Sequence, residues 1–415
     1  MATILPFKGV RPAADKVHLV TSRSAEYYKQ DNLKHKLETN PFSFLHIINP
    51  DFSEGTKTRP GSKERLIKVR KKYESFLKDE ILIRDHKPCY YLYQQAKDDI
   101  LYTGLMACGS TEDYENGIIK KHEQTLSQRE SKLQDYLSVC RFNAEPVLFF
   151  YPEDRVIDAL IGSYLVKHPV YDFTTTDRVR HKLWIIGDNE SVKTLQLSFS
   201  KLNSVYIADG HHRSASSAAL ALELRAKNAN HSGKEGYNYY LGIFFSERQL
   251  RVYDYNRVIS DLNNHSSEEL LEKIKKNFRL LVHNQNAYKP LHLHQFSMYL
   301  DGVWYQLIAK PHICENLNPV EKLDTSILHN HILEPILGIR DPRNDKRLSF
   351  VPGVRGMGEL KNQVDGGKNK IAFGLFPVSM GELKHIADTN RIMPPKTTWV
   401  EPKMRSGLLV YDLEN

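Results

Sequence analysis

The stretch Val205–Arg213 constrains the fold most, because it sets three elements in a fixed order. The apolar and β-branched run Val205–Ala208 predicts a buried strand. Asp209-Gly210 predicts a turn, since glycine adopts backbone conformations that other residues avoid. From Arg213 onward, an Ala/Leu-rich sequence predicts a helix. A strand that enters a helix through a glycine turn directs backbone N–H groups and a positive helix end at one point, which is typical of an anion site.

The turn also carries a carboxylate, two imidazoles and a guanidinium. A plain helix cap is the simpler interpretation, but a cap uses one Asp or Ser and leaves two His and an Arg unexplained. We therefore expect a phosphate site in which Gly210 and the following amides hold the phosphates and Arg213 balances their charge. Asp209 would bind Mg²⁺ or orient a hydroxyl, and His211 or His212 would take a proton.

A second polar cluster, His122-Glu123, stands just before a segment whose composition predicts a helix, Thr125–Tyr136. A glutamate near a helix N-terminus is also explained as a cap that the helix dipole favours, and both interpretations stay open here. In the functional interpretation, Glu123 is a candidate base. His122, Thr125 and Arg129 would then contribute to phosphate or substrate binding.

A third cluster lies in the proline-punctuated stretch Met393–Leu408, where the prolines exclude a helix and favour a rigid loop with a short strand. Lys396, Lys403 and Arg405 are its cations. Three cations on a stiff loop suit a polyanion such as a nucleotide phosphate chain. An ordinary exposed loop is the alternative.

The rest of the chain predicts an α+β fold, with mixed sheets, hairpins and packed helices rather than repeated βαβ units. Phe296–Leu307, split by Asp301-Gly302, predicts a hairpin. A second hairpin is expected from Tyr240–Phe245 and Leu250–Tyr253. Ser266-Ser267-Glu268-Glu269 is the capping-box pattern that opens a helix.

Length and residue pattern predict more than one compact part. We expect an N-terminal α+β part over residues 1–170 and a second part over residues 171–415, or a single intertwined domain. Within Asn40–Ile48, the apolar residues at the C-terminal end predict a strand.

Charge and cysteine usage restrict the partners and the compartment. The formal net charge of +8 admits an anionic ligand, but no long basic run is present, so we expect no nucleic-acid partner. The four cysteines are scattered without a C-x-x-C pair, which argues against a disulfide framework or a cysteine-rich zinc site. No apolar run approaches the roughly 18 residues of a membrane span, and no leader pattern begins the chain. These features predict a cytoplasmic protein.

Several motifs together resemble the domain-of-unknown-function family 1015. They occur in this order along the chain: Pro6-Phe7, Arg11-Pro12, Asn40–Leu45, Lys121–Thr125, Ile207–Arg213 and Met393–Thr398. Through its Asp-Gly-His-His-Arg element this family is similar to the ParB/sulfiredoxin superfamily, and in particular to the archaeal free-serine kinases. The resemblance implies a ParB/sulfiredoxin-like strand-turn-helix site that binds nucleotide phosphates.

Departures from those relatives narrow the chemistry. His211 stands at or near the position of the sulfiredoxin catalytic cysteine, which argues against sulfinic-acid reduction. The helix-turn-helix domain that ParB proteins carry downstream is not recognisable here. Family members often lie beside serine-biosynthesis genes, which makes serine or phosphoserine the natural substrate.

The resulting hypothesis is phosphoryl transfer that involves free L-serine or O-phosphoserine, in the serine-kinase or the phosphoserine-phosphatase direction. ATP or ADP would be the co-substrate and Mg²⁺ the cofactor. The alternative is a ParB-like regulator that binds a nucleotide or a nucleic acid without catalysis. The oligomeric state is left open.

Overall fold

The computed structural model describes residues 1–24, 27–55 and 57–414, which form two compact units. Unit 1 comprises Met1–Lys121, Thr125–Leu250 and Pro402–Asn415. Unit 2 comprises the short segment His122–Gln124 and the long segment Arg251–Glu401. The chain therefore leaves unit 1 twice and returns to it twice.

Unit 1 is built on a sheet that has nine strands among the described residues, in the order β6-β11-β8-β12-β5-β4-β10-β9, with β1 paired to β5. Most pairs are antiparallel, but β11 runs parallel to β6 and β12 runs parallel to β8. The strands are β1 (Ile4–Leu5), β4 (Tyr90–Lys97), β5 (Ile100–Ser110), β6 (Ile119–Lys120), β8 (Val147–Tyr151), β9 (Tyr171–Thr174), β10 (Arg180–Ile186), β11 (Val205–Asp209) and β12 (Tyr239–Ser246). Shorter pairs join β2 (Val10–Pro12) to β3 (Leu82–Arg84) and β7 (Phe142–Asn143) to β21 (Tyr411–Asp412).

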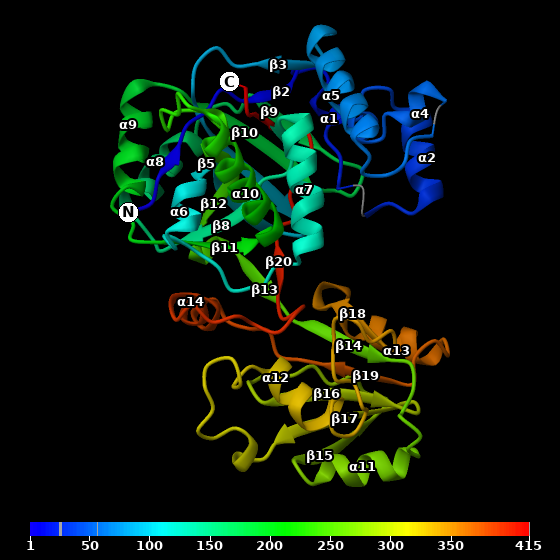
Figure 1. Cartoon of the computed structure of the whole chain (residues 1–415). Helices are drawn as coiled ribbons and strands as arrows, with labels where there is room; N and C mark the ends of the chain where they lie inside the picture. The colour runs from blue at the N-terminus through cyan, green and yellow to red at the C-terminus, as the bar shows by residue number, and fades with distance from the viewer. Residues whose placement is uncertain (25–26, 56, 415) are drawn as a thin grey trace. The chain divides into compact units, whose positions relative to one another are not determined.

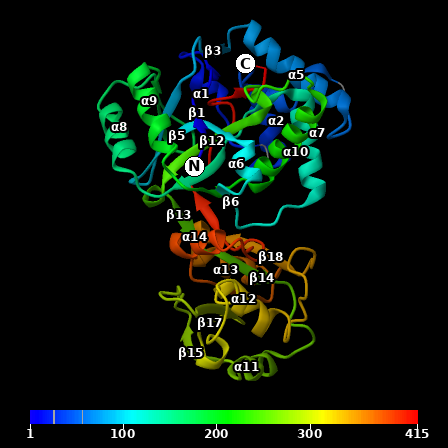
Figure 2. The same ribbon diagram turned by 60° about the vertical axis from the view of Figure 1, so that its left-hand side comes forward.

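Helices surround this sheet (Figure 1). They are α1 (Val17–Val20), α2 (Gln30–Thr39), α3 (Leu45–Ile48), α4 (Asp51–Glu54), α5 (Lys63–Lys78), α6 (Thr111–Glu115), α7 (Ser127–Cys140), α8 (Arg155–Leu165), α9 (Asn189–Phe199) and α10 (His211–Lys227). Both views show α8 and α9 together at one side of the unit and α7 beside α10 at the other (Figures 1 and 2).

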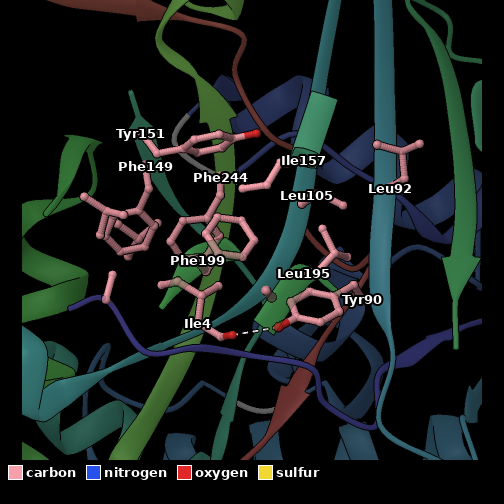
Figure 3. Close-up of a cluster of buried hydrophobic side chains, with 14 of the residues drawn as sticks. Ile4, Tyr90, Leu92, Leu105, Phe149, Tyr151, Ile157, Leu195, Phe199 and Phe244 are labelled. Atoms are coloured by element: carbon pink, nitrogen blue, oxygen red, sulfur yellow. Dashed lines mark hydrogen bonds between the residues drawn. The ribbon is translucent and has the colours of Figure 1, made fainter. Parts of the chain in front are cut away.

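The main core of unit 1 is aromatic. The rings of Phe149 and Phe244 stack with centroids 4.6 Å apart, and Phe199 of α9 meets Phe244 edge-on at 5.8 Å (Figure 3). The Tyr90 hydroxyl donates to the carbonyl of Ile4 at 2.7 Å, so a buried polar atom in this core is paired. Burying aromatic side chains of this size provides much of the free energy that holds the sheet rigid.

Unit 2 contains an antiparallel sheet with six strands among the described residues, in the order β15-β17-β16-β19-β14-β18. They are β14 (Tyr255–Ile259), β15 (Phe278–Asn284), β16 (Gln295–Leu300), β17 (Val303–Ala309), β18 (Leu348–Pro352) and β19 (Ile371–Gly374). Its helices are α11 (Ser267–Lys275), α12 (Asp324–Leu328), α13 (Gly356–Asp365) and α14 (Met380–Asp388). The pair β13 (Arg251–Tyr253) and β20 (Trp399–Glu401) joins the two ends of the long segment.

The predicted α+β fold class is confirmed, and so are several local predictions. Val205–Ala208 lies in β11, and Asp301-Gly302 connects the antiparallel pair β16 and β17. Ser266 and Glu269 form the expected capping box at the start of α11. These features depend on turn and cap chemistry within a few residues, so the sequence carries enough information to specify them.

Two local predictions were wrong. Tyr240–Phe245 and Leu250–Tyr253 do not pair with each other, because β12 is buried on both faces and lies between β5 and β8, while β13 pairs with β20. The apolar run that ends Asn40–Ile48 forms the helix α3, not a strand. Phe44 and Ile47 are buried in a core with α5, and a short apolar run does not distinguish a buried strand from a buried helix.

The compact units also differ from the expected boundary near residue 170. Strand β10 lies after that point but pairs along its whole length with β4, from Arg180 opposite Ala96 to Ile186 opposite Tyr90. The division instead falls at Leu250/Arg251 and Glu401/Pro402, with a brief excursion at His122–Gln124. Over the described residues, every helix is too short or too polar to cross a lipid bilayer.

Candidate functional site

The Asp209–Arg213 turn joins the end of β11 to the start of α10. The pairing of β11 with β8 shifts register between Ile207 and Asp209, which turns the chain out of the sheet. Gly210 has φ of 100°, and a Cβ there would lie 3.0 Å from the Arg213 guanidinium. The helix begins at His211, two residues earlier than predicted. The backbone conformation thus favours glycine at 210, and a larger residue would also press on the Arg213 side chain.

The start of α10 collects N–H groups close to the turn. The Gly210 carbonyl accepts from the amides of Arg213 at 2.9 Å and Ser214 at 3.1 Å. The amides of Gly210, His211 and His212 come just before these two residues in the chain. They lie at the positive end of a 17-residue helix. The first turn of α10, which the structure describes in full, carries no acidic side chain, so the local field favours an incoming anion.

Asp209 is flanked by two cations. Its carboxylate lies 3.7 Å from Lys403 Nζ and 3.5 Å from Arg213 Nη2, and its side chain is 46% exposed. Arg213 also donates from Nη1 to the Pro146 carbonyl at 2.5 Å. Ion pairs this exposed contribute only about 0–1 kcal/mol, so the three groups can exchange partners with a ligand at small cost.

The two histidines of the turn occupy different environments. His211 is buried, with only 4% of its surface exposed. His212 Nε2 accepts a hydrogen bond of 3.0 Å from the backbone N–H of Leu126, the N-cap residue of α7. His212 therefore connects the Asp209–Arg213 turn to the segment that contains Thr125 and, in the first turn of α7, Arg129. No motif could have indicated this contact, because the two residues are 86 positions apart.

Arg405 is engaged inside the protein. Its Nη2 donates to both carboxylate oxygens of Asp177, at 2.6 and 2.7 Å, and to Thr175 Oγ1 at 3.0 Å. Burial alone would raise the pKa of Asp177, but hydrogen bonds from Thr175, Arg23 and Arg405 bring it well below its ordinary value. The charge of Arg405 is balanced by Asp177, and the pair anchors the C-terminal segment two residues from Lys403. Asp177 had no recognisable motif in the sequence.

The remaining predicted residues belong to unit 2. His122 is buried, and its carbonyl accepts from the amide of Met393 at 2.8 Å, while Glu123 follows it directly. Lys396 has a left-handed backbone, with φ of 55°, and its Nζ lies 5.7 Å from the ring centroid of Tyr255. Within unit 1, the structure brings Lys403 and Leu126, the neighbour of Thr125, to the Asp209–Arg213 turn.

A cavity of about 190 Å³ in unit 1 borders the same arginine. It is lined largely by apolar and aromatic side chains from α7, α10, β7 and β12, with Arg213 among its few charged neighbours. Its residues come from six separate stretches of the chain, so no sequence motif could have indicated it.

The residues at the turn fit a magnesium ion that is shared with a ligand. No cluster of three or more His, Cys, Asp or Glu suited to a metal occurs in the part of the chain that the structure describes. Mg²⁺ commonly uses only one or two carboxylates together with substrate phosphates and water. Asp209, exposed at the end of β11, meets that requirement.

Comparisons with known proteins agree with the motif pattern at the level of the family. The family model described as "Protein of unknown function (DUF1015)" matches residues 4–326. No curated protein matches the chain. Among solved structures, a free serine kinase in complex with AMP has a TM-score of 0.36 at 10% identity and covers 73% of this chain and 91% of its own. SbnI from Staphylococcus aureus, truncated at its C-terminus, has a TM-score of 0.38 at 12% identity over 73% and 85%. A conserved hypothetical protein from Pyrococcus furiosus has a TM-score of 0.36 at 11% identity over 73% and 95%.

Proposed function

Because this chain belongs to the DUF1015 family, whose description assigns no activity, we propose its function from the site itself: phosphoryl transfer between a nucleotide and the hydroxyl of a small metabolite. The observation that carries this proposal is the Asp209–Arg213 turn. A strand, a glycine with φ of 100° and the N-terminus of a long helix direct amides at one point, where a carboxylate and two cations also meet.

Phosphate binding would use the amides of Gly210, His211 and His212, with Arg213 and Lys403 neutralising charge. Phosphoryl transfer depends mainly on positioning and on charge stabilisation, which these groups supply without covalent chemistry. The existing ion pairs with Asp209 keep both cations within reach of the turn. Arg405 would act indirectly, since Asp177 already holds its guanidinium.

Asp209 would hold Mg²⁺ together with phosphate oxygens. Bound there, the ion would neutralise charge on the transferred group. Asp209 would then exchange its contacts with Lys403 and Arg213 for the ion, and both cations would turn to the phosphates. The carboxylate and the two cations would therefore pair with one another before the ligand binds, and with Mg²⁺ and the phosphates afterwards.

Proton transfer from the acceptor hydroxyl would fall to His211 or to Glu123. His211 lies in the turn itself and is buried, which keeps water away from it. Glu123 stands next to His122 in the segment that leads into α7. General base catalysis of this kind contributes roughly 10²–10⁴-fold in rate.

We propose free L-serine or O-phosphoserine as the metabolite, ATP or ADP as the nucleotide, and serine metabolism in the cytoplasm as the setting. Transfer to serine and hydrolysis of phosphoserine use the same groups, with water as the acceptor in hydrolysis. The Asp-Gly-His-His-Arg element at residues 209–213, which resembles that of the free-serine kinases, makes serine the substrate to test first.

The test is to incubate the protein with Mg²⁺ and serine plus ATP or ADP, and separately with phosphoserine, and to follow phosphoserine, phosphate and nucleotides. We expect one of these reactions in the wild type and a loss of at least about 100-fold in Asp209→Asn and His211→Ala. Survival of the activity in both variants would refute the assignment. If no reaction occurs and the protein binds DNA with a steep salt dependence, it is a regulator without catalysis.

A further inference from the structure

The cavity beside Arg213 has the size of a single ring system. Its volume is about 190 Å³, below the roughly 300–1,000 Å³ of pockets that enclose a whole drug-sized ligand. Arg213 both lines the cavity and contacts Asp209 in the turn. The side chains of Arg213 and Glu145 remain 29% and 39% exposed, so solvent reaches the cavity beside them. A ligand with phosphates at the turn can therefore place a ring in the cavity.

Aromatic side chains from three separate parts of the chain line the cavity. The ring of Phe142 lies edge-on to Tyr136 of α7, with centroids 5.7 Å apart and planes at 83°. It also lies edge-on to Phe44, at 6.5 Å and 84°. All three rings line the cavity, so a flat aromatic guest can contact them there.

Several oxygen atoms of the lining can accept a hydrogen bond from a ligand. The hydroxyls of Ser216 and Ser217 donate to the Arg213 carbonyl at 3.1 and 2.9 Å, which leaves their oxygen lone pairs for a donor. Glu145 Oε1 accepts from Ser406 Oγ at 2.7 Å. The cavity thus offers apolar walls and a few oxygen acceptors, which match a ring with apolar faces and N–H groups at its edge.

We infer that this cavity binds the purine base of the nucleotide whose phosphates lie at the Asp209–Arg213 turn. The inference rests on the proposed function for the phosphates, and it adds where the base binds and why a nucleotide is preferred over inorganic polyphosphate. Arg213 connects the two subsites. Stacking and burial of the base supply affinity that phosphate contacts alone do not.

Calorimetry with three probes separates the two subsites: ATP, inorganic tripolyphosphate and adenosine. Two substitutions fill the cavity: Ala144→Leu and, at a partly exposed position, Leu133→Trp. If one variant fails to fold, the other still tests the inference. Leu222→Trp on the exposed face of α10 is the matched control, since Leu222 does not line the cavity. Circular dichroism and thermal unfolding establish that each variant is folded.

We expect the wild type and Leu222→Trp to bind ATP at least about fivefold more tightly than tripolyphosphate, from the stacking contribution alone. Both filled variants should bind the two equally, with tripolyphosphate affinity unchanged, and should lose adenosine. Filled variants that keep the ATP preference, or a wild type that binds ATP and tripolyphosphate equally, would overturn the inference. A third outcome separates the two subsites: the protein binds adenosine but not tripolyphosphate, and a filled variant loses adenosine. That result would support a base site in the cavity and refute a phosphate site at the turn.

Discussion

At the scale of single residues, the two adjacent histidines of the turn have separable roles. His211 is buried at the start of α10, whereas His212 accepts the Leu126 amide. An imidazole nitrogen that accepts this hydrogen bond positions the segment around Thr125. A side chain that can accept the same bond should therefore replace His212 better than one that cannot.

We predict that His212→Ala lowers kcat more than it raises KM, and that His212→Gln recovers most of the loss because its amide oxygen can accept from Leu126. Hydrogen exchange provides a readout without catalysis. Loss of one hydrogen bond, worth about 1 kcal/mol, should speed exchange of the Leu126 amide about fivefold in His212→Ala. Equal exchange in wild type and His212→Ala would show that the contact does not hold this segment.

His181 makes stability depend on pH. It is fully buried, with Nδ1 2.6 Å from the Tyr93 hydroxyl, and burial and the nearby Arg405 lower its pKa from 6.5 to about 3. The unfolded chain takes up this proton below about pH 6.5 while the folded protein does not. The contribution of neutral His181 is thus present above that pH and is lost as pH falls toward 3.

We predict that the unfolding free energy of the wild type decreases by up to about 1.4 kcal/mol per pH unit between about pH 6 and pH 4 from this residue. His181→Gln should show a shallower slope in that range, measured by urea unfolding at several pH values. Asp177 contributes in the same direction, but mainly below about pH 4, the ordinary range of an aspartate. Identical slopes in wild type and variant would contradict the burial of a neutral imidazole.

At the scale of elements, the junction of β11 and α10 depends on one glycine. Gly210→Ala should strain the backbone at φ of 100° and press a methyl group against the Arg213 guanidinium. We expect a destabilisation of about 1–3 kcal/mol and at least about tenfold weaker tripolyphosphate binding. Gly233→Ala is the control, because Gly233 also has positive φ, 81°, but a methyl group there would meet no heavy atom of the described residues within 4 Å. Equal effects on binding would show that the turn does not hold phosphate.

Elements that depend on local chemistry were predictable, and those that depend on distant partners were not. The strand and turn at Val205–Gly210 follow from residue types that act within a few positions. Strand β12 looked like one half of a hairpin, yet its neighbours are β5 and β8, which are far away in sequence. For the same reason the sequence indicated Arg405 as a ligand cation but could not show that Asp177 neutralises it.

At the scale of the whole molecule, the long segment Arg251–Glu401 has its own sheet and its own buried clusters. We predict that residues 251–401, produced alone, fold cooperatively, with a β-rich circular dichroism spectrum and a single urea transition. A fragment without cooperative unfolding would show that unit 2 depends on the rest of the chain. The boundary expected near residue 170 differs from this division, because β10, which follows residue 170, pairs with β4, which precedes it.

Which of the candidate residues lie together was predictable from the sequence only in part. Lys403 pairs with Asp209 of the turn inside unit 1, so this cation lies where a bound anion needs it. His122, Glu123 and Lys396 belong to unit 2. Which groups of the second unit take part in catalysis stays a prediction. The cavity beside Arg213 could not be foreseen, because its walls assemble only when α7, α10 and β7 pack.

A phosphate site at the Asp209–Arg213 turn is tested most directly by titrating amide-labelled protein with Mg²⁺ and ATP and following the backbone N–H resonances by NMR. We predict that the amides of Gly210, His211 and His212 shift most, and that inorganic tripolyphosphate shifts the same three. In Asp209→Asn, addition of Mg²⁺ should no longer change the shifts that ATP produces, because the carboxylate that holds the ion is gone. Resonances that move elsewhere in the chain while those three stay fixed would contradict a phosphate site at this turn.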